Sequence, residues 1–154
     1  MPPLLYAARA GNFDAVSALL ERSANVNARA ATSASAWSVH GQATWCAIHA
    51  AAHRGDSEML GLLLDGDACI SARATRGTTA LHFAACQGRL AAVQLLLSRG
   101  ADADAKDDDG FTALDDTYER RQFARLALKC NCVQQAQAAT DFRKHIEAIA
   151  VLLE

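Results

Sequence analysis

Residues 79–100 carry the spacing of apolar and polar positions that predicts two consecutive amphipathic helices. Thr79 stands where a hydroxyl can cap the first helix, and Gly88 suits the tight turn that reverses the chain. Gly100 fits the position just after the second helix, where a positive φ is needed. The second helix presents one apolar stripe, made of Leu90, Val93, Leu96 and Leu97. A helix pair of this kind cannot bury its stripe alone and needs a neighbour.

The whole pattern recurs with a period of 33 residues. The motif TALH at residues 79–82 returns as CAIH at 46–49 and as TALD at 112–115. The turn glycines Gly55 and Gly88 keep the same spacing, so the repeat extends beyond a single motif. A fixed period of this length predicts a solenoid in which successive helix pairs stack and bury one another's stripes.

Residues 77–105 resemble the ankyrin repeat closely, with GTTALHFAACQGR followed by VQLLLSRGADADA. Residues 4–28 resemble a first repeat without the usual start, as terminal repeats often do. The resemblance implies an all-α repeat solenoid, a stack of antiparallel helix pairs with finger loops. We expect one ankyrin-like domain over 1–154, with repeats at about 1–29, 41–73, 74–106 and 107–154.

The first two repeats are separated by an insertion. Gly11 and Gly55 lie 44 residues apart, eleven more than the period, and the extra residues fall at about 30–41. We expect one enlarged, exposed finger loop there, carrying Trp37 and His40. An exposed tryptophan is costly unless something covers it, so the loop is either floppy or functional.

The fourth repeat also departs from the pattern. Arg121 stands where the register predicts a turn glycine, so we expect the first helix of this repeat to run on. The missing second helix then lies late in the chain, capped near Thr140, with an apolar stripe of Ile146, Ile149, Leu152 and Leu153. The alternative keeps residues 122–131 as the regular second helix and makes the last helix an added cap.

The composition argues against several classes of partner. Net charge is -2, with 15 basic and 17 acidic residues, so we expect no nucleic-acid partner and no binding to membrane surfaces. No apolar run approaches the length of a membrane span, and the first residues lack the features of a signal peptide. Five cysteines, an odd number without a disulfide framework, favour reduced thiols. We therefore expect a soluble, cytoplasmic monomer.

One group of residues invites a metal site or a nucleophile. Cys46, His49 and His53 fall roughly on one face of a predicted helix. The ankyrin resemblance implies instead that His49 and His82 bond to neighbouring backbone and tie repeats together. The stretch around His49 also lacks the glutamate of the zinc motif HExxH. We expect no metal, no cofactor and no enzymatic activity, and keep this site as the alternative.

The remaining candidate motifs favour plain structural roles. Cys130 and Cys132 are too close for a zinc knuckle and have no second pair at finger distance. The acidic run before Gly110 does not fit a calcium loop, because alanine would take its first position. We interpret the run as a solvated finger in which Asp108 and Asp109 can serve a basic partner. Phosphate-binding loops are absent, and no catalytic triad is indicated.

The resemblance implies that partners bind a concave surface made of finger tips and first helices. The finger-tip position is taken by Trp45, Thr78 and Phe111, and large aromatics there are typical of binding hot spots. The alternative for Trp45 is that it packs under the long loop. First-helix and loop positions that complete the predicted surface are His53, Cys86, Glu119, Trp37, His40, Asp108 and Asp109.

These features predict a protein-interaction module, an adaptor, scaffold or inhibitor. A structural segment of a larger assembly remains a further alternative. Asn27 lies in the finger motif NVNA, where the resemblance suggests hydroxylation, but bonding within the turn is the simpler interpretation and the one we prefer.

Overall fold

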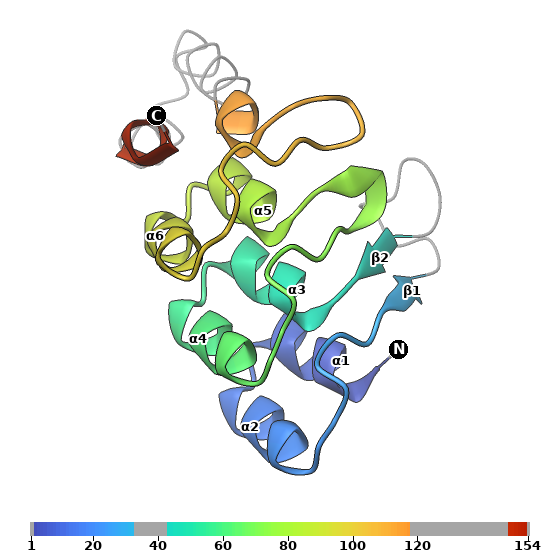
Figure 1. Ribbon diagram of the computed structural model, residues 1–154. Helices are drawn as coiled ribbons and strands as arrows, with labels where there is room; N and C mark the ends of the chain where they lie inside the picture. Colours follow the sequence, from blue (N-terminus) through green and yellow to red (C-terminus); the bar gives the residue numbers. More distant parts are fainter. Residues whose placement is uncertain (1, 33–42, 118–147, 154) are drawn as a thin grey trace, which may run out of the picture.

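The computed structural model describes residues 2–32, 43–117 and 148–153 as a stack of helix pairs with loops along one side (Figure 1). The helix pairs are α1 (Pro3–Ala10) with α2 (Phe13–Glu21), α3 (Ala47–Arg54) with α4 (Ser57–Asp65), and α5 (Ala80–Cys86) with α6 (Leu90–Ser98). Residues 113–117 and 148–153 are also helical. The helical solenoid predicted from the sequence is confirmed.

The pairs stack through their first helices, α1 against α3 and α3 against α5, while α4 packs against α6. Alanines line α3 at Ala50, Ala51 and Ala52, all at most 1% exposed, and their small side chains allow neighbouring helices to approach closely. The larger core residues come from both helices of each pair, as Ile48 and Leu60 show. Apolar burial between repeats therefore holds the stack together.

The helix ends follow the sequence expectations. Gly88 has φ 67° in the turn between α5 and α6, and Gly100 has φ 85° after α6, as the pattern predicted. Thr79 is the N-cap residue of α5. In the other pairs Asn12 and Asp56 cap the second helix, each accepting a 3.0 Å hydrogen bond from a first-turn amide.

The finger between repeats 1 and 2 differs from a plain enlarged loop. Strands β1 (Ala30–Thr32) and β2 (Ala43–Trp45) pair in antiparallel register, so the first inserted residues are strand and not loop. The amide of Thr44 also donates to the hydroxyl of Thr75, 2.8 Å away, in the 3₁₀ turn η1 (Thr75–Gly77) of the next finger. The insertion thus adds a small sheet to the helical fold, because the longer finger lets its two arms pair.

Several predicted features lie outside the described residues. Trp37, His40, Glu119, Cys130 and Cys132 are among them, as is Arg121 with most of the expected closing hairpin. Of that hairpin the structure describes residues 148–153, where Ile149 is buried. No helix in the described ranges has the length and apolar character needed to cross a membrane.

Candidate protein-binding surface

The histidine of the recurring motif fixes each finger to the helix before it. In repeat 2 the Nδ1 atom of His49 accepts the amide hydrogen of Cys46, 3.1 Å away. Its Nε2 atom lies 2.9 Å from the carbonyl oxygen of Ala72 and donates to it. His49 is fully buried, and this burial lowers its pKa to about 4. The ring is therefore neutral at pH 7, with its proton on Nε2.

His82 makes the equivalent connection in repeat 3. Its Nε2 atom lies 3.1 Å from the carbonyl oxygen of Phe111 and donates to it. Its Nδ1 atom accepts from both the amide and the hydroxyl of Thr79, at 3.3 and 2.9 Å. The tie between repeats that the resemblance implied for both histidines is thus present in the structure.

These hydrogen bonds argue against a metal site or an activated nucleophile at the CAIH motif. His49 has both ring nitrogens engaged, so no lone pair remains for a metal. Burial raises the pKa of the Cys46 thiol, with nearby Arg29 opposing the effect, and a thiol is a poor nucleophile. Within residues 2–32, 43–117 and 148–153, no group of three or more His, Cys, Asp or Glu could hold a metal ion.

Trp45 lies in an aromatic cluster on the finger side of the first helices. Its ring centroid is 4.7 Å from that of Phe83 and 5.7 Å from that of His53. Phe83 in turn lies edge-on to His49, 5.7 Å away. Trp45 is half-buried, so packing against α3 and α5 holds it in place.

Phe83 also belongs to this surface, although the sequence pattern did not predict it. The available signal was its size, because the register position that holds Phe83 in α5 holds Ala50 in α3. The bulkier ring of Phe83 extends toward repeat 2 and packs against the rings of Trp45 and His53.

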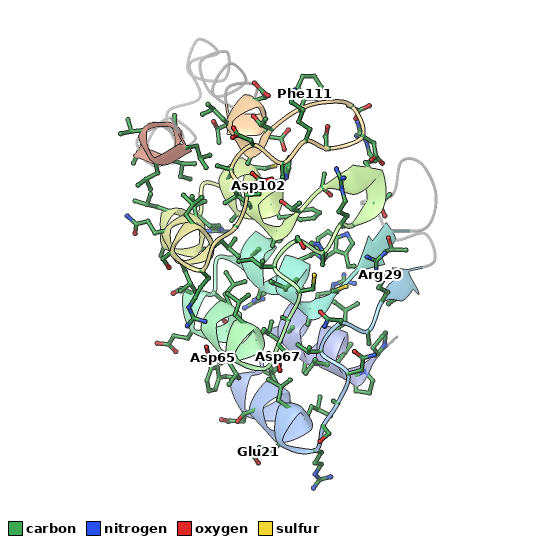
Figure 2. All side chains as sticks on the ribbon, viewed as in Figure 1. Glu21, Arg29, Asp65, Asp67, Asp102 and Phe111 are labelled. Atoms are coloured by element: carbon green, nitrogen blue, oxygen red, sulfur yellow. The ribbon has the colours of Figure 1, made fainter. Side chains whose placement is uncertain are left out.

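Phe111, at the equivalent finger position, is 47% exposed on a fixed backbone. Its amide donates to Oδ1 of Asp107, 2.9 Å away, and its carbonyl accepts from His82. Thr78, between the two aromatic positions, is half-buried and donates to the carbonyl of Thr75. Figure 2 shows Phe111 at the loop that follows α6.

The acidic finger is less open than a simple solvated loop. Asp109 forms an ion pair with Arg76 of the previous finger, and the amide of Asp108 donates to the Arg76 carbonyl. Asp107 accepts the amides of Asp109 and Phe111, which closes the turn. Part of the negative charge that was predicted to serve a basic partner is therefore neutralised within the chain.

Two predicted first-helix positions, His53 on α3 and Cys86 at the end of α5, are half-buried.

Asn27 connects repeats through both ends of its side-chain amide. Nδ2 donates to the carbonyl of Asp67 at 3.1 Å, and Oδ1 accepts from the amide of Cys69 at 2.8 Å. The bonds of Asn27 thus cross to the loop after α4.

Comparison with known proteins identifies the family that shares this architecture. The chain matches the model for ankyrin repeats (3 copies) over residues 29–107 and 48–138, and the single ankyrin repeat model over 1–31. The chain therefore belongs to the ankyrin-repeat family. Its members use the repeat stack as a general protein-interaction module.

Similar proteins are much longer than this chain. The E3 ubiquitin-protein ligase KEG of Arabidopsis thaliana is 31% identical over 64% of the chain and 6% of its own length. Ankyrin repeat and SOCS box protein 3 of Homo sapiens is 34% identical over 64% of the chain and 18% of its own length. The ankyrin repeat domain of Bcl-3 matches in structure with a TM-score of 0.63 and 27% identity, over 73% of this chain and 45% of that one.

Proposed function

We propose that the chain is a non-catalytic adaptor, scaffold or inhibitor that binds a protein partner on its concave surface. We define this surface by the finger positions Trp45, Thr78 and Phe111 and the first-helix positions His53 and Cys86. The observation that carries the proposal is the exposed ring of Phe111, because its finger is fixed on both sides by hydrogen bonds. Preorganised aromatic anchors are typical of interface hot spots.

The spacing of the two aromatic anchors supports a protein partner over a small ligand. Trp45 and Phe111 occupy equivalent positions two repeats apart. Neighbouring helices pack about 8–10 Å apart, so the two side chains are separated by roughly 20 Å. A helix or an extended segment of a partner covers that distance, whereas a metabolite does not.

Further residues extend the proposed surface. Trp37 and His40 of the inserted loop and Glu119 of repeat 4 are included on sequence grounds. Asp108 and Asp109 contribute at its edge, where the pairing of Asp109 with Arg76 limits their free charge. We also propose a reducing, cytoplasmic setting, which the free thiols of Cys46 and Cys69, two of the described cysteines, support.

The test is affinity for a partner identified from the native cell and then purified. Phe111→Ala should weaken its binding roughly 30-fold or more, as expected for a hot-spot residue worth about 2 kcal/mol. Trp45→Ala should do the same, although it also removes packing against Phe83. Phe13→Ala is the matched control, because Phe13 is an exposed aromatic residue on α2, a second helix outside this surface.

Two results would count against the proposal. Unchanged affinity in both the Phe111 and Trp45 variants would mean that the partner binds elsewhere, and would favour a structural role within a larger assembly. Turnover of a partner or metabolite that depends on Cys46 or His49 would restore the catalytic alternative.

A further inference from the structure

Exposed arginines lie at the turns between the two helices of each pair. Arg9 lies in the last turn of α1, Arg54 is the last residue of α3, and Arg89 directly precedes α6. All of these side chains are exposed. The pairs follow one another along the stack (Figure 1), so each repeat contributes one arginine to the same side of it. We call Arg9, Arg54 and Arg89 the arginine column.

Contacts between neighbouring repeats hold this column together. The guanidinium of Arg54 lies against Gly11, where an added Cβ would collide with it. Nη1 of Arg54 also donates to the carbonyl oxygen of Arg9, 3.3 Å away. The aliphatic part of Arg89 lies against Gly55 in the same way. Arg54 and Arg89 thus each extend back by one repeat onto the preceding turn, and the column is continuous over the first three repeats.

The column borders the concave surface. Arg9 and His53 stand at equivalent positions, two residues before the turn glycine of their repeats. Arg54 directly follows His53, and the ring of His53 lies 5.7 Å from that of Trp45. The arginines therefore lie at the far ends of the first helices, beyond the aromatic cluster of Trp45 and Phe83.

No carboxylate neutralises this positive charge within the part of the chain that the structure describes, where none of the three arginines forms an ion pair. The acidic residue closest in sequence to Arg54 is Asp56, whose side chain caps α4 by accepting the amide of Met59. On the acidic finger, by contrast, Asp109 is paired with Arg76. The arginine column is therefore available to pair with carboxylates of a partner.

Arg89 is also a poor residue for the start of its own helix. The equivalent positions in the first two pairs hold Asn12 and Asp56, which each cap the following helix. Arg89 is the N-cap residue of α6 but makes no side-chain cap hydrogen bond. A guanidinium cannot accept an amide hydrogen, and its charge opposes the positive end of the helix dipole. A residue that breaks a local rule in this way is expected at a functional site.

We propose that the arginine column binds an acidic segment of the protein partner that occupies the concave surface. This inference rests on the function proposed above and names the chemistry of the partner. An apolar side chain of the segment packs on Trp45 and Phe83, while Asp or Glu carboxylates pair with the arginines through two parallel hydrogen bonds.

The spacing of the column suits an extended segment. Neighbouring helices pack about 8–10 Å apart, and an extended chain advances about 3.3 Å per residue. Acidic residues about three positions apart therefore reach successive arginines. The net charge of -2 disfavours a nucleic acid, because its dense negative charge would be repelled by the rest of the chain.

Selection of short random peptides displayed on phage tests this chemistry. The wild-type chain should enrich peptides that combine an apolar residue with several acidic ones. An Arg54→Glu, Arg89→Glu double variant should lose this enrichment. Arg22→Glu is the matched control and should enrich the same peptides as the wild type, because Arg22 is exposed at the end of α2, outside the concave surface.

Affinities of one selected acidic peptide then separate binding from folding. The double variant should bind it roughly tenfold or more weakly, because attraction becomes repulsion. Arg89→Asn supplies the cap that the other pairs have, so it should raise the melting temperature by about 2–4 °C. The same variant should bind the peptide roughly threefold more weakly, since one ion pair is lost. Weaker binding by a more stable chain cannot come from misfolding.

Several results would overturn the inference. They are a selection that enriches no acidic peptide, an affinity unchanged in the Arg54 and Arg89 variants, and tighter binding of a labelled single-stranded DNA than of the peptide. Peptides that depend on Trp45 and Phe111 but not on the arginines would defeat this inference alone. Peptides that depend on none of these residues would defeat the proposed function as well.

Discussion

The imidazole of His82 donates a hydrogen bond from Nε2 to the carbonyl oxygen of Phe111, 3.1 Å away. A side chain that is 1% exposed thereby controls the finger that presents a 47% exposed ring. His82 cannot contact a partner itself, so its influence on binding is transmitted through the backbone of the finger.

Replacing His82 should therefore loosen that finger. His82→Ala leaves the Phe111 carbonyl and the Thr79 hydroxyl without their partner, which should cost about 1–3 kcal/mol of unfolding free energy. Amide exchange at Asp107 and Phe111 should become faster in hydrogen-exchange mass spectrometry. Gln94→Ala, on the exposed face of α6, is the control and should change neither quantity. Unaltered exchange in the His82 variant would show that other contacts hold the finger.

His49 should make the fold sensitive to acid. Its pKa is about 4 in the folded protein, below the ordinary value of 6.5, so the unfolded chain binds more protons between these pH values. The free energy of unfolding should fall as pH drops from 6.5 toward 4, by up to about 3 kcal/mol from this group. Urea titrations at several pH values measure the slope. His49→Gln should be less stable at pH 7 and should lose most of the slope, and a slope that persists in it would assign the effect to other groups.

Gly61 offers a stabilising substitution. It lies inside α4, where a Cβ would meet no atom within 4 Å. Gly61→Ala should raise the unfolding free energy by about 0.5–1 kcal/mol, because alanine loses less backbone entropy in a helix. Gly55→Ala is the matched opposite, since Gly55 has φ 80° and a Cβ there would collide with Arg89. It should destabilise the chain, and thermal unfolding of the pair checks the sign of both effects.

Asn27 should contribute stability across the first two repeats. Asn27→Ala removes the bonds to Asp67 and Cys69, and should cost about 1–3 kcal/mol. Asn25→Ala removes only a local turn bond to the amide of Asn27 and should cost less. Equal losses in the two variants would show that turn formation, and not the link between repeats, is what Asn27 supplies. Mass spectrometry of the native protein tests separately whether Asn27 is hydroxylated.

Local periodicity explains how much of the fold was predictable. The 33-residue period and the glycines at turn positions depend on neighbours in sequence, so Gly88, Gly100 and the helix pairs followed from the pattern. The hydrogen bonds by which His49 and His82 connect repeats could also be predicted, because their motif resembles that of the ankyrin repeat. The placement of Trp37 and His40 stays a prediction.

Contacts between repeats were harder to predict, because they depend on the sizes and directions of distant side chains. The packing of Phe83 on Trp45 and the pairing of Arg76 with Asp109 join residues at least one full repeat apart. The β1–β2 pairing was missed for a related reason, since alanine-rich arms carry no strand periodicity.

The histidine bonds have a consequence for how such a chain can change in evolution. His49 holds the backbone at Ala72, and His82 holds it at Phe111, so each finger is positioned by the helix that precedes it. Units gained or lost after a given repeat leave the fingers before it anchored. A change in repeat number toward the C-terminal end therefore leaves the histidine bonds of the earlier fingers in place, whereas the packing of Trp45 also requires Phe83 of the following repeat.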